Sequence, residues 1–137
     1  MKGLDDVVVA DVNLGDYSTT TYLAASYPRS VFLEKGYLWE VVDFRIVGST
    51  NYAAAADTFV FYLKDASGNT IATMNNAATG IAVNPATGID SSPVAAYKTI
   101  DTESAASYLQ IVPTISGVGK ALVGLRAIVR LKQLRNS

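Results

Sequence analysis

The sequence predicts an all-β chain that folds as an antiparallel β-sandwich or barrel. Apolar side chains recur at every second position in several segments, which is the period of a half-buried strand and not of a helix. Turn-forming residues separate these segments at intervals of roughly 8–12 residues. This spacing favours a sandwich or barrel of about eight to ten short strands over an α/β fold.

Strands and one hairpin are expected in the N-terminal part of the chain. Residues 8–14 alternate apolar and polar side chains, and a shorter strand is expected near residues 19–23. Residues 30–33 and 37–39 flank the sequence Glu-Lys-Gly at residues 34–36, which is typical of a turn. We therefore expect these two flanking segments to pair as a hairpin.

The central part of the chain contains the clearest strands. In residues 40–46, the two faces of the expected strand are Val42, Phe44 and Ile46 on one side and Val41, Asp43 and Arg45 on the other. Residues 58–64 repeat the alternation, and residues 65–69 read Asp-Ala-Ser-Gly-Asn, a sequence typical of a turn. Because residues 70–74, Thr-Ile-Ala-Thr-Met, can return as a strand after this turn, the region predicts a hairpin.

The C-terminal part contains one segment with two interpretations. Short strands are expected at residues 95–100 and 107–112, the second ending at Pro113. Residues 120–135 fit a strand, because every second residue from 121 to 131 is apolar, and they also fit a helix with an apolar stripe. The β-branched residues and the flanking glycines favour the strand.

Residues 66–97 carry a single charged side chain, Asp90. One interpretation is a long surface loop with a short strand at residues 81–83. The other is a contact loop that packs on a partner, because small uncharged residues lose little solvation when they are buried. Both interpretations remain open at the level of sequence.

The length of 137 residues predicts one domain, residues 1–137, with a flexible N-terminal arm (1–6) and a C-terminal tail (133–137). Hydrophobic residues make up 50% of the chain and charged residues 17%, below the average of about 25%. Such a chain has more apolar surface than one small domain hides, so we expect a homodimer or homotrimer, or docking onto a larger body. No run resembles a signal peptide or a membrane span, so we expect no membrane partner and synthesis in the cytoplasm.

The composition excludes several kinds of chemistry. The chain has 0 His and 0 Cys, so it lacks an imidazole base, a thiolate nucleophile and the usual zinc ligands. Residues 117–120 match only the end of a phosphate-binding loop. Residues 11–16 resemble the start of a calcium loop but have Asp16 at the sixth position, where that loop needs glycine. We therefore expect no catalytic residue, cofactor or metal. A hydrolase that uses only carboxylates would need two acids converging in a cleft.

The formal net charge of -1 conceals an uneven distribution, with acids near the start and only cations after residue 116. These charges either lie on solvated strand edges or form complementary patches across a subunit contact. Tyr37 and Trp39 share a strand face and either fill the core or stack on a ligand. The candidate partner-interface residues are Asp5, Asp6, Tyr37, Trp39, Asp43, Arg45, Arg126, Arg130, Lys132 and Arg135. A net charge near zero speaks against a nucleic-acid partner.

Two neighbouring segments carry a family resemblance. Lys35-Gly36-Tyr37 leads into a strand ending Asp-Phe-Arg-Ile-Val at residues 43–47, and residues 59–72 read Phe-Val-Phe-Tyr-Leu-Lys-Asp-Ala-Ser-Gly-Asn-Thr-Ile-Ala. Over about residues 30–75 the chain resembles the small jelly-roll decoration, or cement, proteins of tailed-bacteriophage capsids. The resemblance implies a jelly-roll-like sandwich in the virion that oligomerises and clamps adjacent major capsid proteins.

Two main hypotheses of function follow. The first is a non-enzymatic virion structural protein, a decoration protein whose partners are itself and the major capsid protein. The alternative is a ligand-binding β-sandwich module, such as the carbohydrate- or receptor-binding tip of a phage tail or fibre. In that module Tyr37, Trp39 or exposed tyrosines would form the stacking surface.

Overall fold

A computed structural model describes residues 6–18, 29–47, 58–75, 89–116 and 121–135. These residues contain strands and turns but no helix, so none of them forms a helix long enough to cross a membrane. The strands are β1 (Asp6–Ser18), β2 (Arg29–Leu33), β3 (Leu38–Val47), β4 (Thr58–Lys64), β5 (Thr70–Asn75), β6 (Ile89–Asp90), β7 (Thr99–Asp101), β8 (Ser107–Ser116) and β9 (Ala121–Arg135). The all-β prediction is confirmed, although β1 and β9 are longer than the short strands expected.

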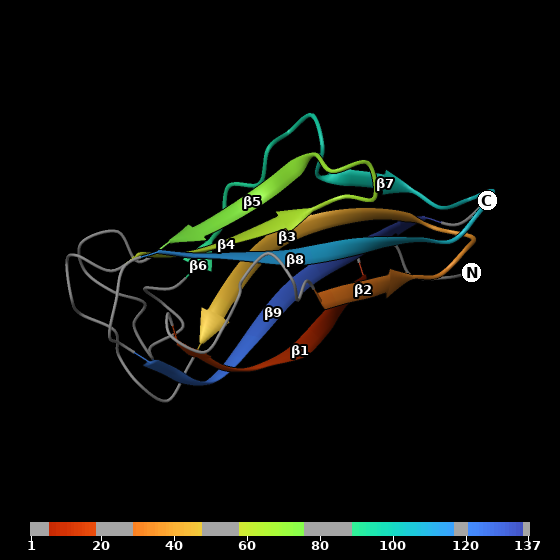
Figure 1. The fold of residues 1–137 in the computed structure, drawn as a ribbon. Helices are drawn as coiled ribbons and strands as arrows, with labels where there is room; N and C mark the ends of the chain where they lie inside the picture. The colour runs from red at the N-terminus through yellow and green to blue at the C-terminus, as the bar shows by residue number, and fades with distance from the viewer. Residues whose placement is uncertain (1–5, 19–28, 48–57, 76–88, 117–120, 136–137) are drawn as a thin grey trace.

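The strands form two antiparallel sheets that pack face to face (Figure 1). Sheet A has the order β1-β9-β3-β6, with β7 also paired to β3, and sheet B has the order β2-β8-β4-β5. In the described part of the chain, β4 and β5 are the only strands adjacent in sequence that pair with each other. When β6 and β7 count as one interrupted strand, this order is that of a jelly roll, so the expected fold class is confirmed.

The core lies between the sheets and is filled by alternate residues of the central strands. Fully buried side chains come from both layers: Phe44, Ile46, Phe61, Leu63, Leu109, Ile111, Leu125, Ala127 and Val129. Each fully buried large side chain stabilises the fold by roughly 1.5–3 kcal/mol. The period-two pattern in the sequence therefore reports directly which residues face the opposite sheet.

The ambiguous C-terminal segment is a strand. β9 lies between β1 and β3 and pairs with both, so its backbone groups are used on its two edges. Leu125, Ala127, Val129 and Leu131 face the core, and the intervening residues face outward. β9 continues through the buried Gln133 to Arg135, three residues into the segment 133–137 for which we expected a tail, and β1 begins at Asp6, the last residue of the expected arm.

A β-bulge in β3 corrects the predicted faces of residues 40–46. Val41 lies opposite Leu131 and Asp43 opposite Arg130, so Val42 is an extra residue in the strand. The bulge shifts the alternation by one position. As a result Val41 faces the core like Phe44 and Ile46, and the prediction that Val41 lies on the outer face is wrong.

The expected hairpin around residues 34–36 is wrong, because β2 and β3 belong to different sheets. The turn instead carries the chain from sheet B to sheet A. Gly36, at a φ of 107°, donates its N–H to the carbonyl oxygen of Thr102 at 2.7 Å. The turn is thus fixed to Thr102, the residue that follows β7 and lies far from the turn in sequence.

Two strand boundaries also differ from expectation. Residues 95–98 form a turn, and only Thr99–Asp101 form β7. β8 does not end at Pro113 but continues to Ser116, with Pro113 opposite Phe61. β2 pairs with β8 only as far as Ile111, so beyond that residue one edge of β8 has no described partner strand. The nitrogen of Pro113, which cannot donate a hydrogen bond, can face this edge.

Part of the sequence interpretation falls outside the described residues. This holds for the strands expected near residues 19–23 and at 81–83. In the segment 66–97 the structure describes the β4–β5 turn, β5, β6 and the turn that follows.

Candidate interaction surfaces

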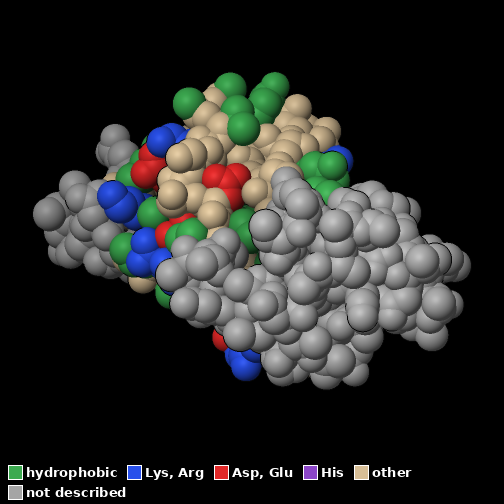
Figure 2. Space-filling model, turned by 90° about the vertical axis from the view of Figure 1, so that its left-hand side faces the viewer, with side chains coloured by type: hydrophobic (Ala, Val, Ile, Leu, Met, Phe, Trp, Pro, Cys, Tyr) green, Lys and Arg blue, Asp and Glu red, His purple; other side chains and the backbone are tan. Residues whose placement is uncertain are grey.

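The outer face of sheet A is lined by charged side chains in alternation (Figure 2). Arg126, Arg130 and Lys132 of β9 point outward, between the acids of β1 and β3. Arg126 Nε donates to Asp11 Oδ1 at 2.9 Å, and a second guanidinium nitrogen bonds the other carboxylate oxygen. The hydrogen bond to Asp11, with its charge, raises the pKa of Arg126 above its ordinary value.

The acidic start and the basic end of the chain are therefore neighbours in one sheet. β1 and β9 pair antiparallel from Asp6↔Gln133 to Ser18↔Ala121. One interpretation of the sequence was that these acids and bases meet across a subunit contact. Asp11 and Arg126 instead form an ion pair within the chain. Asp5 lies outside the described residues, and the side chains of Asp6 and Arg135 are likewise not described.

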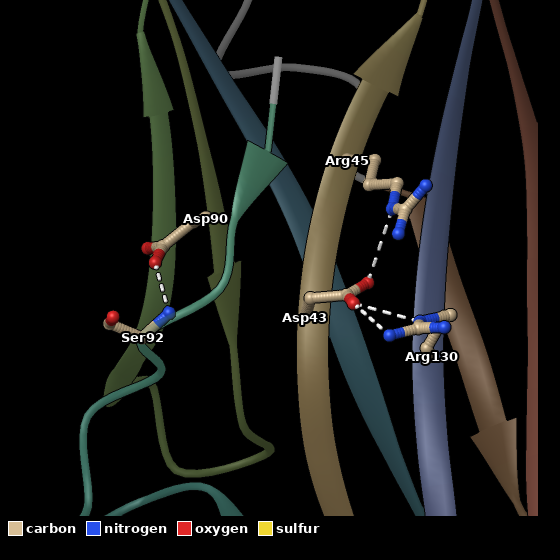
Figure 3. Close-up of polar contacts among 5 residues, drawn as sticks. All are labelled: Asp43, Arg45, Asp90, Ser92 and Arg130. Carbon is tan, nitrogen blue, oxygen red and sulfur yellow. Dashed lines mark hydrogen bonds and ion pairs between the residues drawn. The ribbon is translucent and has the colours of Figure 1, made fainter. Parts of the chain in front are cut away.

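Asp43 is the most buried charged side chain of the described residues, only 2% exposed although it lies on the outer face of sheet A. Its Oδ2 accepts hydrogen bonds from Arg130 Nε at 2.8 Å and pairs with Nη2 at 2.7 Å (Figure 3). Its Oδ1 lies 3.5 Å from Arg45 Nε, without a hydrogen bond between them. Two arginines thus share one carboxylate, and two guanidinium nitrogens of Arg130 contact the same oxygen, Oδ2, in a charge-assisted pair.

Tyr37 and Trp39 belong to the core side of sheet A. Trp39 is buried, with its ring centroid 5.3 Å from that of the half-buried Tyr37. Trp39 Nε1 donates to the hydroxyl of the fully buried Thr102 at 3.1 Å, and that hydroxyl lies 2.6 Å from the carbonyl oxygen of Glu34, to which it donates. The core interpretation of Trp39 is therefore the correct one, and its ring is not exposed as a stacking surface.

The outer face of sheet B is nearly free of charge. Among the described residues of β2, β4, β5 and β8, only Lys64 and Arg29, the first residue of β2, are charged. Lys64 faces outward, and its Nζ lies 5.5 Å from the centre of the Tyr62 ring. Phe32 on β2 and Tyr108 on β8 are directly opposite in register, 70% and 40% exposed. We call these two residues the aromatic pair.

A second exposed apolar surface lies on β1, the edge strand of sheet A. Val7, Val8 and Val9 are 52%, 37% and 55% exposed, and no described strand pairs with their outer side. We call these three residues the valine edge. β1 and β2 are in contact, so the valine edge and the aromatic pair belong to the same edge of the sandwich (Figure 1).

The opposite edge of the sandwich is covered by the chain itself. Asp90 of β6 accepts a hydrogen bond from the backbone N–H of Thr73 on β5 at 2.9 Å, and its other oxygen accepts from Ser92 N–H at 2.9 Å. Val94 N–H donates to the carbonyl oxygen of Ile71 at 2.8 Å. Backbone groups of β5 that would otherwise face solvent are therefore bonded.

The aromatic pair and the valine edge were not among the residues singled out from the sequence, although a signal for the aromatic pair exists. In residues 30–33, Val31 and Leu33 occupy the core-facing positions, so Phe32 must face outward. The same holds for Tyr108, which precedes the buried Leu109. An aromatic residue on the outward face of a strand is the feature that sequence reasoning could have used.

The described residues contain no group of three or more Asp or Glu side chains that could hold a metal ion. Among the acids on the outer face of sheet A, Asp11, Glu40 and Asp43 each pair with a cation. Glu40 lies 3.4 Å from the ammonium nitrogen of Lys98. The described part thus has paired charges on the outer face of sheet A and exposed apolar side chains at the aromatic pair and the valine edge.

No protein-family model and no curated protein sequence matches the chain. Among solved structures, the chain is similar to the VP2 subviral particle of infectious bursal disease virus, with 14% identity over 98% of this chain and 34% of that chain, at a TM-score of 0.40. It is also similar to a protein of Bacillus endospore appendages, which form disulfide-linked pili, with 16% identity over 97% of this chain and 93% of that chain, at a TM-score of 0.34. The chain thus spans about a third of the VP2 chain, and at these identities and TM-scores we infer nothing about function from the likeness.

Proposed function

We propose that this protein is a non-enzymatic virion structural protein, a decoration protein that binds and stabilises a capsid shell. The observation that carries the proposal is the aromatic pair on the nearly uncharged outer face of sheet B. A monomer gains nothing from exposing a phenylalanine to this extent, and aromatic side chains are enriched at the centres of protein interfaces. The resemblance of residues 30–75 to cement proteins supplies the partner, the major capsid protein.

In this function the two faces of the sandwich have different tasks. The charges on sheet A are largely paired within the chain, so binding through that face would require breaking ion pairs such as Asp43 with Arg130. The face of sheet B has few charges to desolvate, and its burial against capsomers would add apolar interface across their seams. Bound copies would oppose expansion of the shell, because expansion would expose that interface again.

The proposal is tested by mixing the purified protein with capsids that lack it. We expect saturable binding with a fixed stoichiometry, and we expect the double substitution Phe32→Ser and Tyr108→Ser to weaken binding by roughly a hundredfold, as for the loss of an interface centre. Tyr97→Ser is the matched control, because Tyr97 is also exposed but lies in the turn between β6 and β7. Failure of the unsubstituted protein to bind, or equal binding by the double variant, would contradict the proposal.

The alternative, a ligand-binding module, is favoured by the same aromatic pair. Phe32 and Tyr108 side by side on a sheet face could stack on a sugar ring, whereas the buried Trp39 could not. A glycan array separates the two functions. Binding of a glycan that Phe32→Ala abolishes without lowering the temperature of the thermal transition would establish the module and replace the capsid proposal.

A further inference from the structure

We infer that the valine edge is a self-association site at which β1 of one copy pairs antiparallel with β1 of a second copy about a two-fold axis at Val9. The pairing would join two five-stranded sheets into one continuous sheet. The inference goes beyond the proposed function, because it gives a site to the homodimer expected from the sequence, and it concerns a different surface from the aromatic pair.

The first argument is that described residues cover one edge of the sandwich, whereas no described strand pairs with the outer side of β1 at the other. At the β5 edge, Asp90 and Val94 bond the backbone of Thr73 and Ile71. On β1, the register shifts that would twist an edge away from a partner occur only after Asn13, between Asn13 and Gly15 and between Gly15 and Tyr17. The part of β1 before these shifts has neither a bulge nor a proline or lysine, which are the usual protections of an edge strand.

The second argument is the exposure of three consecutive valines. Successive residues of a strand point to opposite faces, so Val7 and Val9 are exposed on the outer face and Val8 on the core side. A strand added in the plane of the sheet would place a cross-strand side chain beside these valines on both faces. Pairing with a second copy would shield all three valines and use backbone groups on the outer side of β1.

The third argument identifies the occupant through the register. Directly opposite residues of paired strands share a face, so a two-fold axis perpendicular to the sheet must pass between the two copies of one residue. An axis at Val9 places Val9 against Val9 of the second copy, and Val7 against Asp11, so no two carboxylates face each other directly. Val9 also lies near the middle of the regular part of β1, which begins at Asp6 and ends at the first register shift.

The neighbouring strand fits this register. Val9 lies opposite Arg130 of β9, whose guanidinium is already paired with Asp43, and Val7 lies opposite Lys132. In the proposed dimer, Asp11 of one copy would therefore lie one strand away from Lys132 of the other, across Val7. This placement brings an acid and a base closer together across the interface without burying either one.

The test uses the absence of cysteine from the chain. Cα atoms of directly opposite residues in antiparallel strands are about 4.5–5.5 Å apart, within the range of a disulfide. We expect the full-length Val9→Cys variant to form a covalent dimer on mild oxidation, and Val94→Cys, equally a substitution of an exposed valine but at the covered edge, to remain monomeric on the same denaturing gel.

Sedimentation equilibrium of the purified protein without capsids supplies the second measurement. We expect a dimer whose dissociation constant rises at least about tenfold in Val9→Lys, because two ammonium groups would then face each other at the axis. A monomer at all concentrations, a dimer that Val9→Lys does not weaken, or cross-linking of Val94→Cys as fast as Val9→Cys would overturn the inference. Because no capsid is present, this result is independent of the capsid-binding test, which depends on Phe32 and Tyr108.

Discussion

The carboxylate of Asp43 shows how tertiary context changes the environment of a single residue. The alternation of β3 correctly places Asp43 on an outward face near Arg45. Its hydrogen-bond partner is Arg130, which is 87 residues away in sequence and reaches it from β9. A buried carboxylate is tolerated only when it is paired, so the two strands are matched at this position by charge as well as by backbone bonds.

We expect Asp43→Asn to destabilise the protein by about 1–3 kcal/mol. The amide keeps the shape of the side chain but removes the charge that balances Arg45 and Arg130, and its N–H groups would face guanidinium donors. The measurement is the free energy of unfolding from urea denaturation at neutral pH.

Asp11→Asn is the matched control for this prediction, because Asp11 also pairs with an arginine of β9 but is exposed. An exposed ion pair is screened by water and salt, so we expect a smaller loss than for Asp43→Asn and one that shrinks further at high salt. Equal losses for the two variants would show that burial of Asp43 has no energetic consequence.

At the scale of single elements, turn chemistry predicts where the chain turns but not which strand it joins next. Residues 65–69 form the expected hairpin, with Asp65 Oδ1 accepting from the N–H groups of Ser67 at 3.0 Å and Asn69 at 2.9 Å. Residues 34–36 also turn, yet the chain crosses to the other sheet. The difference is set by Thr102, a distant residue whose backbone and hydroxyl bond the crossing turn.

We expect Gly68→Ala to destabilise the β4–β5 turn by about 1–2 kcal/mol. Gly68 has a φ of 90°, which an alanine adopts only with strain, whereas a Cβ there would meet nothing within 4 Å. The cost is therefore purely that of the backbone. Thermal unfolding followed by circular dichroism measures it.

Ser67→Ala tests whether the effect is specific to the glycine position. Ser67 is exposed in the same turn and contributes its backbone N–H, which alanine retains, so the change should stay within about 0.5 kcal/mol. A similar loss in both variants would mean that the turn, and not the positive φ, is sensitive to substitution.

At the scale of the whole molecule, the jelly-roll order makes nearly all pairings non-local. β1 pairs with β9, β2 with β8 and β3 with β9, so strands from the two ends of the chain must meet before either sheet is complete. Closing long loops costs entropy before the contacts form, which slows folding. The β4–β5 hairpin is the one pairing in the described part that can form locally.

We therefore expect refolding on a timescale of milliseconds to seconds or longer. Trp39 is the only tryptophan and is buried in the core beside Tyr37, so its fluorescence reports formation of the core. Stopped-flow dilution from urea measures this signal. Complete recovery within microseconds would contradict the non-local topology.

The sequence alone determined the fold class, most strand positions and the identity of most core residues. These features depend on local periodicity, because a strand buries every second side chain whatever its partner is. It also predicted the β4–β5 hairpin and the outward position of Arg126 and Arg130, since both follow from alternation and turn chemistry. The strand alternative for residues 120–135 was favoured but not decided.

Only the tertiary structure decided the partners of the strands, and with them the surfaces. The bulge at Val42, the crossing turn at residues 34–36 and the internal pairing of the acidic β1 with the basic β9 all depend on residues far apart in sequence. Which edge is covered and which is open depends in the same way on where β6 lies. Periodicity is a local property of the chain, whereas an exposed edge is a property of the assembled sheets, and for this reason the valine edge emerged only from the fold.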